Sequence, residues 1–382
     1  MDHITFIVAM VIVTALAFDF TNGCHDTANA MATSIATGAL KPKVAVLISG
    51  VLNLVGAFLS TEVAKTISGG IVDDTLVTPG MIFAGLVGAI LWNLMTWLLG
   101  LPSSSSHALF GGLIGAVWVG AGRHGVHFDM VVEKILIPAV ASPVVAGLAA
   151  LAATYLAYRL TNRSSKDTVS KGFRTGQIAS ASLVSLAHGT NDAQKTMGVI
   201  TLALISCGAL GHDAGPPVWV ILTAGLSIAL GTYIGGWRMI RTMGKGIVDI
   251  ESPQGFAAES AATAVILTSA NLGFALSTTQ VCSGGILGAG VGRRLAEVRW
   301  GTAGRMALAW LVTLPAAGAV GAVAASAVVH GGNTGLVLIA AAAIVVAGVI
   351  VVLSRRNPVH AENVNNTPTT AVRPVAAAGA GA

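Results

Sequence analysis

Long apolar stretches alternate with short polar segments along almost the whole chain. A helix that crosses a bilayer needs about 20 mostly apolar residues. The stretches that approach this length are 4–40, 44–60, 81–101, 103–120, 135–158, 178–207, 217–240, 256–276, 278–292, 303–329 and 335–354. Two of them, 103–120 and 278–292, are short and rich in glycine, so we expect re-entrant half-helices there. The pattern predicts an all-α polytopic membrane protein.

The composition excludes a water-soluble globular protein. Apolar side chains make up 54% of the 382 residues and charged ones only 10%, whereas soluble domains have about 25% charged residues. The net charge of +5 forms no dense basic tract, which argues against nucleic-acid binding. The three cysteines lie in apolar sequence and predict no disulfide framework. The first apolar stretch has neither a basic start nor a cleavage site, so we expect a retained span.

Two polar segments divide the chain. Residues 159–177 carry five Lys and Arg residues against a single Asp, which predicts a basic cytoplasmic loop. Residues 357–382 are mainly Asn, Thr, Pro, Ala and Gly without periodicity, which predicts a disordered tail. We expect one repeat unit with a connecting helix in 1–158, and a second unit with C-terminal helices in 178–356.

Three motifs recur in the same order in these two units, at offsets between 166 and 176 residues. Three matches in one order indicate a duplicated unit. The matched segments are Gly23–Met31 with Gly189–Met197, Thr66–Asp73 with Thr242–Asp249, and Ser104–Ala116 with Ser277–Ala289.

The distribution of Lys and Arg predicts how the two units are oriented. One arrangement of the crossings places 16 of the 21 Lys and Arg residues on the cytoplasmic side, as the positive-inside rule requires. In that arrangement the second unit runs through the membrane with the opposite polarity to the first. The sequence therefore predicts an inverted-topology repeat with broken helices and two re-entrant hairpins, a common architecture among secondary transporters.

Each unit places one aspartate inside an otherwise apolar stretch, at Asp26 and Asp192. A carboxylate at bilayer depth costs about 2.5–3.5 kcal/mol, so it should face the protein interior or an aqueous cavity. The small and polar residues around each one predict a helix break whose free carbonyls ligate a cation. A hydrogen-bonded aspartate that caps a kink is the structural alternative. Glu259 is expected near the membrane interface, and Asp19 is ambiguous.

Two residues break the symmetry between the units. Lys195 follows Asp192 by three residues, where the first unit has Asn29, and this spacing allows an ion pair on one helix face. Its ammonium group could replace a coupling metal ion or attract an anion. His25, which stands opposite Asn191, could bind a proton, and a histidine that only contacts a neighbouring helix is the alternative.

Runs of hydroxyl residues lead into two of the glycine-rich stretches, at 103–106 and 277–279. Ser and Thr in this position cap helix N-termini, whose free N–H groups and positive dipole end favour anions. Two such ends facing each other would surround a tetrahedral oxyanion such as phosphate or sulfate with donors. Capping without any ligand is the alternative.

Together these motifs resemble the inorganic phosphate transporter (PiT) family over residues 4–356. The string His188–Gly198 is similar to the bacterial low-affinity branch, whose members are typically proton-coupled. The resemblance implies an inverted-repeat homodimer in the cell membrane. It also implies a central phosphate held by the Ser/Thr hairpin tips, with the aspartate motifs at the coupling-ion sites.

Site residues follow from the resemblance, position by position. The residues implied for phosphate are Ser104, Ser105, Ser106, Ser277, Thr278, Thr279 and Gln280. Those implied for the proton or coupling ion are His25, Asp26, Asn29, Asn191, Asp192 and Lys195. His25 and Lys195 stand where the family pattern has Asn, and the Lys195 departure favours protons over sodium. No cofactor and no resident metal are expected.

The sequence thus predicts secondary active symport of inorganic phosphate, free or as a metal complex, with H⁺ into the cytoplasm. The alternatives are a Na⁺-coupled phosphate symporter, a sulfate permease of the same family and, from a different class, a passive anion channel. A carboxylate that accepts the hydrogen bond of HPO₄²⁻ favours phosphate over sulfate, which carries no proton. An enzyme is not expected, because no HExxH, GxSxG or Walker A motif occurs.

Overall fold

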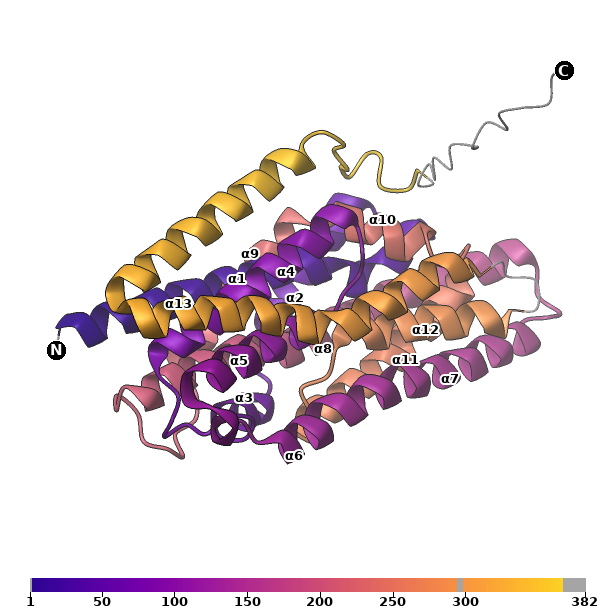
Figure 1. The fold of residues 1–382 in the computed structure, drawn as a ribbon. Helices are drawn as coiled ribbons and strands as arrows, with labels where there is room; N and C mark the ends of the chain where they lie inside the picture. Colours follow the sequence, from indigo (N-terminus) through magenta and orange to yellow (C-terminus); the bar gives the residue numbers. More distant parts are fainter. Residues whose placement is uncertain (1, 294–297, 367–382) are drawn as a thin grey trace, which may run out of the picture.

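The computed structural model describes residues 2–293 and 298–366, most of which are helical (Figure 1). Within these residues, β structure is limited to two isolated bridges, Val72 with Val126 and Val248 with Val298. A 3-10 turn precedes α6, and a π turn joins α6 to α7. The α-helices are α1 Asp2–Ala36, α2 Pro42–Gly56, α3 Glu62–Gly69, α4 Pro79–Leu99, α5 Ser105–Ala121, α6 Phe128–Val131, α7 Ile137–Leu160, α8 Lys166–Ser206, α9 Val218–Ile234, α10 Trp237–Lys245, α11 Ser252–Asn271, α12 Thr278–Gly292 and α13 Trp300–Ser354.

Four helices in the described part of the chain are long and apolar enough to cross a membrane: Phe6–Ala36 of α1, α4, the continuous segment Phe128–Leu160, and α13. The pair α9 and α10 forms a fifth candidate span, bent by 69°. Helix α13 turns back at Gly332, where φ is 53°. Its second half runs along the outside of the bundle and packs against the first core at Leu336 and Ile339 (Figure 1). The chain is therefore a multi-pass membrane protein, although fewer stretches qualify as complete spans than the eleven in the sequence pattern.

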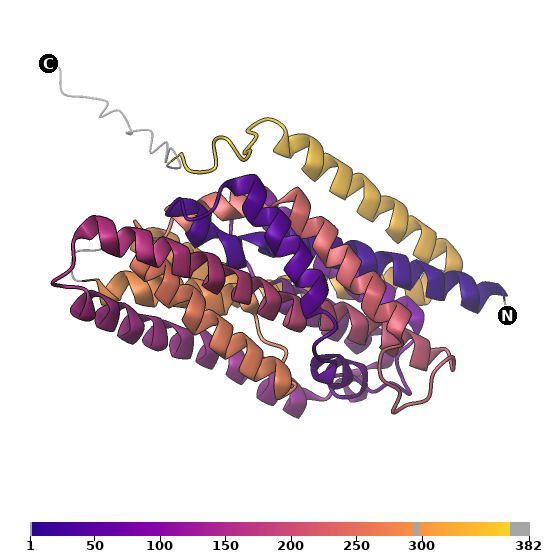
Figure 2. The same ribbon diagram turned by 180° about the vertical axis from the view of Figure 1, so that it is seen from behind.

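Two apolar cores lie along the bundle, and α1 and α8 pass through both. These two long helices contact each other inside the bundle (Figure 1, Figure 2). The first core contains Phe18 of α1 and Met197 of α8, and the second contains Met31 and Val184. The polar motifs of both helices therefore lie where the two cores meet.

The predicted helix breaks at Asp26 and Asp192 are wrong, because α1 and α8 continue through both positions. The glycines there serve close packing instead. A Cβ atom on Gly23 would lie 2.9 Å from the Thr232 backbone nitrogen of α9, and one on Gly189 would collide with the backbone of Asn53 in α2. Two helices can approach this closely only where the residue at the contact has no larger side chain. Glycine, which suggests a helix break in the sequence, therefore permits close helix packing here.

Each hydroxyl run caps a helix that packs against its predecessor. Residues 100–104 join α4 to α5, and residues 272–277 join α11 to α12. Ser104 Oγ accepts a hydrogen bond from the His107 backbone N–H at 3.1 Å, and Ser277 Oγ accepts one from the Gln280 N–H at 3.3 Å. The sequence therefore located both helix starts correctly.

The two polar segments are more ordered than predicted. Within 159–177 only residues 161–165 lie outside α7 and α8. Helix α8 starts early in this segment, where Ser165 Oγ caps it by accepting a hydrogen bond from the Thr168 N–H at 3.2 Å. The first part of the expected tail, 357–366, is held against the bundle: Arg241 donates to the Asn363 carbonyl at 2.9 Å, and Val364 is 1% exposed. The rest of that tail, 367–382, lies outside the described residues.

An exposed ion pair joins the loop after α3 to the loop before α9. His212 Nδ1 and Asp74 Oδ2 are 2.8 Å apart, and this hydrogen bond raises the pKa of His212 above its ordinary value. The pair therefore contributes fully below about pH 6.5 and is lost as the pH rises through the raised pKa. We expect Asp74→Asn to return the His212 titration, measured by NMR, to about 6.5. An unchanged titration would contradict this contact, and Asp213→Asn is the matched control.

Candidate functional site

A buried polar cluster lies at the junction of the two cores. Helices α1 and α8 supply their aspartate motifs, and α5 and α12 supply their N-terminal turns. Every one of the 13 residues predicted for the site is 5% exposed or less. The structure therefore brings together residues that lie as much as 255 positions apart in the chain.

Asp26 accepts hydrogen bonds from both N-terminal turns. Its oxygens lie 2.8 Å from Ser105 Oγ of α5 and 3.2 Å from Thr279 Oγ1 of α12. The neighbouring His25 places Nδ1 at 2.6 Å from Asp26 Oδ1. On the next turn of α1, the Asn29 side-chain amide donates to Thr279 Oγ1 at 3.1 Å and reaches Thr278 Oγ1 at 3.3 Å. Asp26 and Asn29 thus link α1 directly to the start of α12.

Asp192 forms the ion pair with Lys195 that their spacing predicts, at 2.5 Å. The same ammonium group donates to Ser106 Oγ of α5 at 2.6 Å. Thr278 Oγ1 lies 3.2 Å from Asp192 Oδ2 and 3.5 Å from Asp26 Oδ2, so its one proton can serve either carboxylate. Both N-terminal turns therefore contact both aspartate motifs.

The remaining predicted residues have different surroundings. The Oγ atoms of Ser104 and Ser277 accept the capping hydrogen bonds, and each hydroxyl keeps its own proton to donate. Gln280 Oε1 and Asn191 Oδ1 are buried without a hydrogen-bond partner among the described residues. Unpaired buried acceptors are costly, so these two atoms mark where a donor or cation would be favourable.

His188 also belongs to this cluster, although the sequence analysis did not select it. Its Nδ1 lies 3.2 Å from Asn53 Oδ1, an atom that can only accept, so Nδ1 carries a proton. Its Nε2 faces two carboxylate oxygens, 3.3 Å away in Asp192 and 3.9 Å away in Asp26. A bare lone pair against two carboxylates is repulsive, so this position favours a bound proton or metal cation.

The ligand atoms of Asp26, His188 and Asp192 all lie within 4.8 Å of one another, close enough to hold a metal ion. Carboxylate and imidazole groups are common ligands of divalent cations. No metal ligand was predicted from the sequence, because His188 was not recognised as part of the site. The spacing of four residues between His188 and Asp192 was the available signal, since it places both on one helix face.

Two more buried carboxylates were not recognised from the sequence. Asp19 is 0% exposed, and neither of its oxygens accepts a hydrogen bond of normal geometry from another described residue, although Thr196 lies alongside. Glu259 was expected at the membrane interface, but it is 3% exposed and accepts hydrogen bonds from Ser180, Thr33 and Gln177. The packing of α11 against α1 and α8 buries it, and no sequence pattern shows that contact.

The buried charges do not balance. The carboxylates of Asp19, Asp26, Asp192 and Glu259 are all buried, whereas Lys195 is the only buried Lys or Arg side chain in the described parts of the chain. An isolated ion in an apolar interior is so costly that it is paired or neutralised. A bound proton or cation would therefore stabilise these carboxylates.

Comparison with known proteins agrees with the motifs. Residues 22–321 match the model of a family described as the phosphate transporter family. A "Probable low-affinity inorganic phosphate transporter" of Mycobacterium tuberculosis (strain CDC 1551 / Oshkosh) is 59% identical over 363 residues, which cover 94% of this chain and 87% of that protein. A protein of the same description from Bacillus subtilis (strain 168) is 42% identical over 85% of this chain and 98% of its own length.

One solved structure has a similar fold. It is described as "The sodium-dependent phosphate transporter" and aligns with a TM-score of 0.75 at 24% identity, over 83% of this chain and 98% of that one. The family match covers well over half of the sequence, and the Mycobacterium tuberculosis relative is similar over almost all of it. The chain therefore belongs to the phosphate transporter family.

Proposed function

We propose that this protein is a secondary active transporter that carries inorganic phosphate into the cytoplasm together with H⁺. One observation carries the proposal: the Asp26, His188 and Asp192 trio, which favours a bound proton or cation, touches the N-terminal turns of both α5 and α12. A cation site and two anion-attracting helix ends in one buried cluster suit coupled movement of a cation and an anion. The descriptions of the relatives as low-affinity inorganic phosphate transporters agree with this assignment.

Phosphate would bind at the hydroxyls of Ser105, Ser106, Thr278 and Thr279. In the structure three of these hydroxyls donate to the two aspartates and the fourth accepts from Lys195. A phosphate that enters would take over these hydroxyls and gain the free N–H groups of two helix ends. The carboxylate that it displaces would then be short of donors, which favours uptake of a proton or cation at the same time.

The inverted repeat and the two re-entrant hairpins belong to this proposal. The pair α4 and α5 corresponds to α11 and α12, and the bridge between Val72 and Val126 corresponds to that between Val248 and Val298. Two related units of opposite polarity would bring equivalent hydroxyl-bearing helix starts to one central site. The homodimer and the plasma-membrane location are predictions of the same family resemblance.

Phosphate uptake into proteoliposomes under imposed gradients tests the coupling. Each pH unit supplies about 1.4 kcal/mol per coupled proton, so one unit should give about tenfold phosphate accumulation if one proton accompanies each phosphate. We expect the pH gradient to drive uptake and a sodium gradient to leave it unchanged. Uptake driven by neither gradient would point to the passive anion channel instead.

Two further arms of this experiment separate the remaining alternatives. An excess of sulfate should leave phosphate uptake unchanged, because sulfate has no proton to donate to Asp26 or Asp192. Strict dependence on added Mg²⁺ would indicate that phosphate travels as a metal complex, with the metal as part of the substrate. The trio of Asp26, His188 and Asp192 is the place where such a metal would bind.

A further inference from the structure

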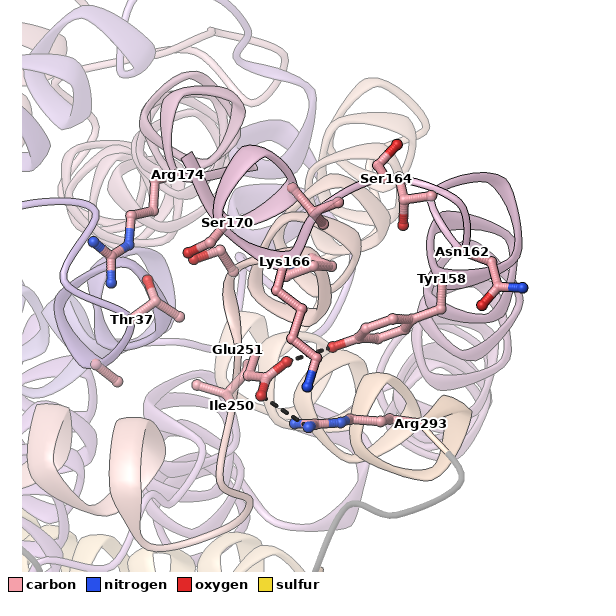
Figure 3. A pocket seen from close by; sticks show the side chains of 15 residues that line it. Thr37, Tyr158, Asn162, Ser164, Lys166, Ser170, Arg174, Ile250, Glu251 and Arg293 are labelled. Carbon is pink, nitrogen blue, oxygen red and sulfur yellow. Dashed lines mark hydrogen bonds and ion pairs between the residues drawn. The ribbon is translucent and has the colours of Figure 1, made fainter. Parts of the chain in front are cut away.

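A cavity of about 590 Å³ lies at one end of the bundle, away from the buried cluster (Figure 3). It is formed where the C-terminal ends of α1, α7 and α12 meet the N-terminal ends of α8 and α11. The distribution of Lys and Arg assigns this end to the cytoplasm. A cavity of this size is within the range of small-molecule sites.

The charged groups around the cavity are mainly cationic. Lys166, Arg174 and Arg293 line it together with a single carboxylate, Glu251 (Figure 3). Glu251 is already engaged, since Arg293 lies 2.8 Å from one of its oxygens and the Tyr158 hydroxyl donates to the other at 3.0 Å. The side chains of Lys166 and Arg174 make no hydrogen bond or ion pair with another described residue. The cavity wall therefore carries two unpaired cations, Arg174 beside Thr37 and Lys166 beside Glu251 (Figure 3).

The neutral groups complete a donor set for an oxyanion. The hydroxyls of Ser164 and Ser170 also line the cavity. Ammonium, guanidinium and hydroxyl groups together are the usual partners of a phosphate group. The positive-inside rule accounts for basic residues at this end, but not for their convergence on one cavity.

A line of polar side chains connects the cavity with the buried cluster. Thr37 donates to Gln177 Oε1 at 2.7 Å, and Gln177 donates to Glu259 Oε1 at 3.2 Å. Thr33 donates to the same Glu259 oxygen at 2.5 Å. Asn29 and Thr33 lie one turn apart on one face of α1, and Thr37 follows four residues later, just after the helix ends at Ala36. Asn29 belongs to the cluster and Thr37 to the cavity wall, so the line spans the distance between them.

We propose that this cavity is a second phosphate site at the cytoplasmic end, through which phosphate leaves the buried cluster. The proposal rests on the proposed transport function, and it assigns Lys166 and Arg174 as the residues that hold the ion on release. Phosphate that has passed Glu259 meets two free cations there, which offsets the repulsion that a carboxylate along the route imposes.

Equilibrium binding of radiolabelled inorganic phosphate to the purified full-length chain tests this site. We expect two sites in the unaltered protein when it is reconstituted in discs of phosphatidylcholine. The double variant Lys166→Gln with Arg174→Gln should weaken one of them about tenfold, which corresponds to about 1.4 kcal/mol. Both side chains are exposed, so the substitutions should leave folding unchanged.

The matched control is Arg159→Gln with Arg163→Gln, which removes the same charge from the same segment but outside the cavity. We expect this control to bind phosphate at two sites with unaltered affinity. If both double variants lose phosphate affinity equally, the effect comes from the overall charge of the segment and the proposal is overturned. A single phosphate site in the unaltered protein would also overturn it. The cavity could instead bind the headgroup of phosphatidylglycerol. In that case phosphate binding by the two double variants would differ only in discs that contain this lipid, and this result would also overturn the proposal. Uptake in proteoliposomes, measured separately, shows whether the transport function itself fails.

Discussion

Asp192→Asn should reduce phosphate uptake at least about a hundredfold. The substitution keeps the shape of the side chain but removes the charge that pairs with Lys195 at 2.5 Å and faces His188 Nε2 at 3.3 Å. Removing one partner of a buried ion pair leaves the other charge uncompensated, and a loss of about 3 kcal/mol at the transport step corresponds to about a hundredfold slower uptake. Initial uptake rates in proteoliposomes measure the effect.

The control for this variant is Asp167→Asn, because Asp167 also pairs with a lysine of α8 but is exposed. We expect its uptake to remain normal. Both variants should insert into the membrane and elute as monodisperse protein after solubilisation, since Asn can still accept hydrogen bonds from Asn22 and Thr278. Near-normal uptake by Asp192→Asn would show that Asp192 has a structural role, and the proposed coupling would then lose its basis.

The sequence predicted those parts of the fold that depend on local pattern. The predicted stretch 278–292 coincides with α12, and the hydroxyl runs mark both helix caps correctly. The spacing of three residues between Asp192 and Lys195 was sufficient to predict their ion pair. In each case the relevant partner lies within one turn of the same helix, or at its immediate start.

The parts that the sequence could not predict depend on contacts between helices. Gly23 and Gly189 suggested helix breaks because a residue without a Cβ suits both a break and a close contact. Only the positions of α2 and α9 decide between the two. Glu259 lies near the start of an apolar stretch, and its burial depends on how α11 packs against α1 and α8.

His188 shows how a single missed residue changes the chemistry of the site. Without it, the two aspartates are carboxylates that share hydroxyl donors. With it, they become a trio in which a proton or cation has a defined place. The repeat hides this residue, because the first unit has Asn22 at the equivalent position, and Asn22 itself donates to Asp192 at 3.4 Å.

Lys195→Asn should change the cation that phosphate uptake requires. Lys195 Nζ lies 2.5 Å from Asp192 Oδ1 and 2.6 Å from Ser106 Oγ, and it is 0% exposed. The first unit has Asn29 at this position. An Asn at 195 would leave a space lined by carboxylate, hydroxyl and amide oxygens, which are the ligands that hard cations prefer. We expect proton-driven uptake to fall at least about tenfold, because one ion-pair contribution of about 1.4 kcal/mol or more is lost, and we expect added Na⁺ to restore part of it.

The comparison with Lys195→Met separates the two roles of the lysine. Met nearly fills the same space but offers neither charge nor oxygen, so this variant should fail to transport phosphate with either cation. If both variants keep the normal response to the pH gradient and neither responds to Na⁺, Lys195 only supports the structure. If Lys195→Asn alone responds to Na⁺, the buried ammonium group occupies the place of a coupling cation. This assignment would also explain why the cluster pairs Asp192 with a fixed positive charge, whereas Asp26 has no buried Lys or Arg partner among the described residues.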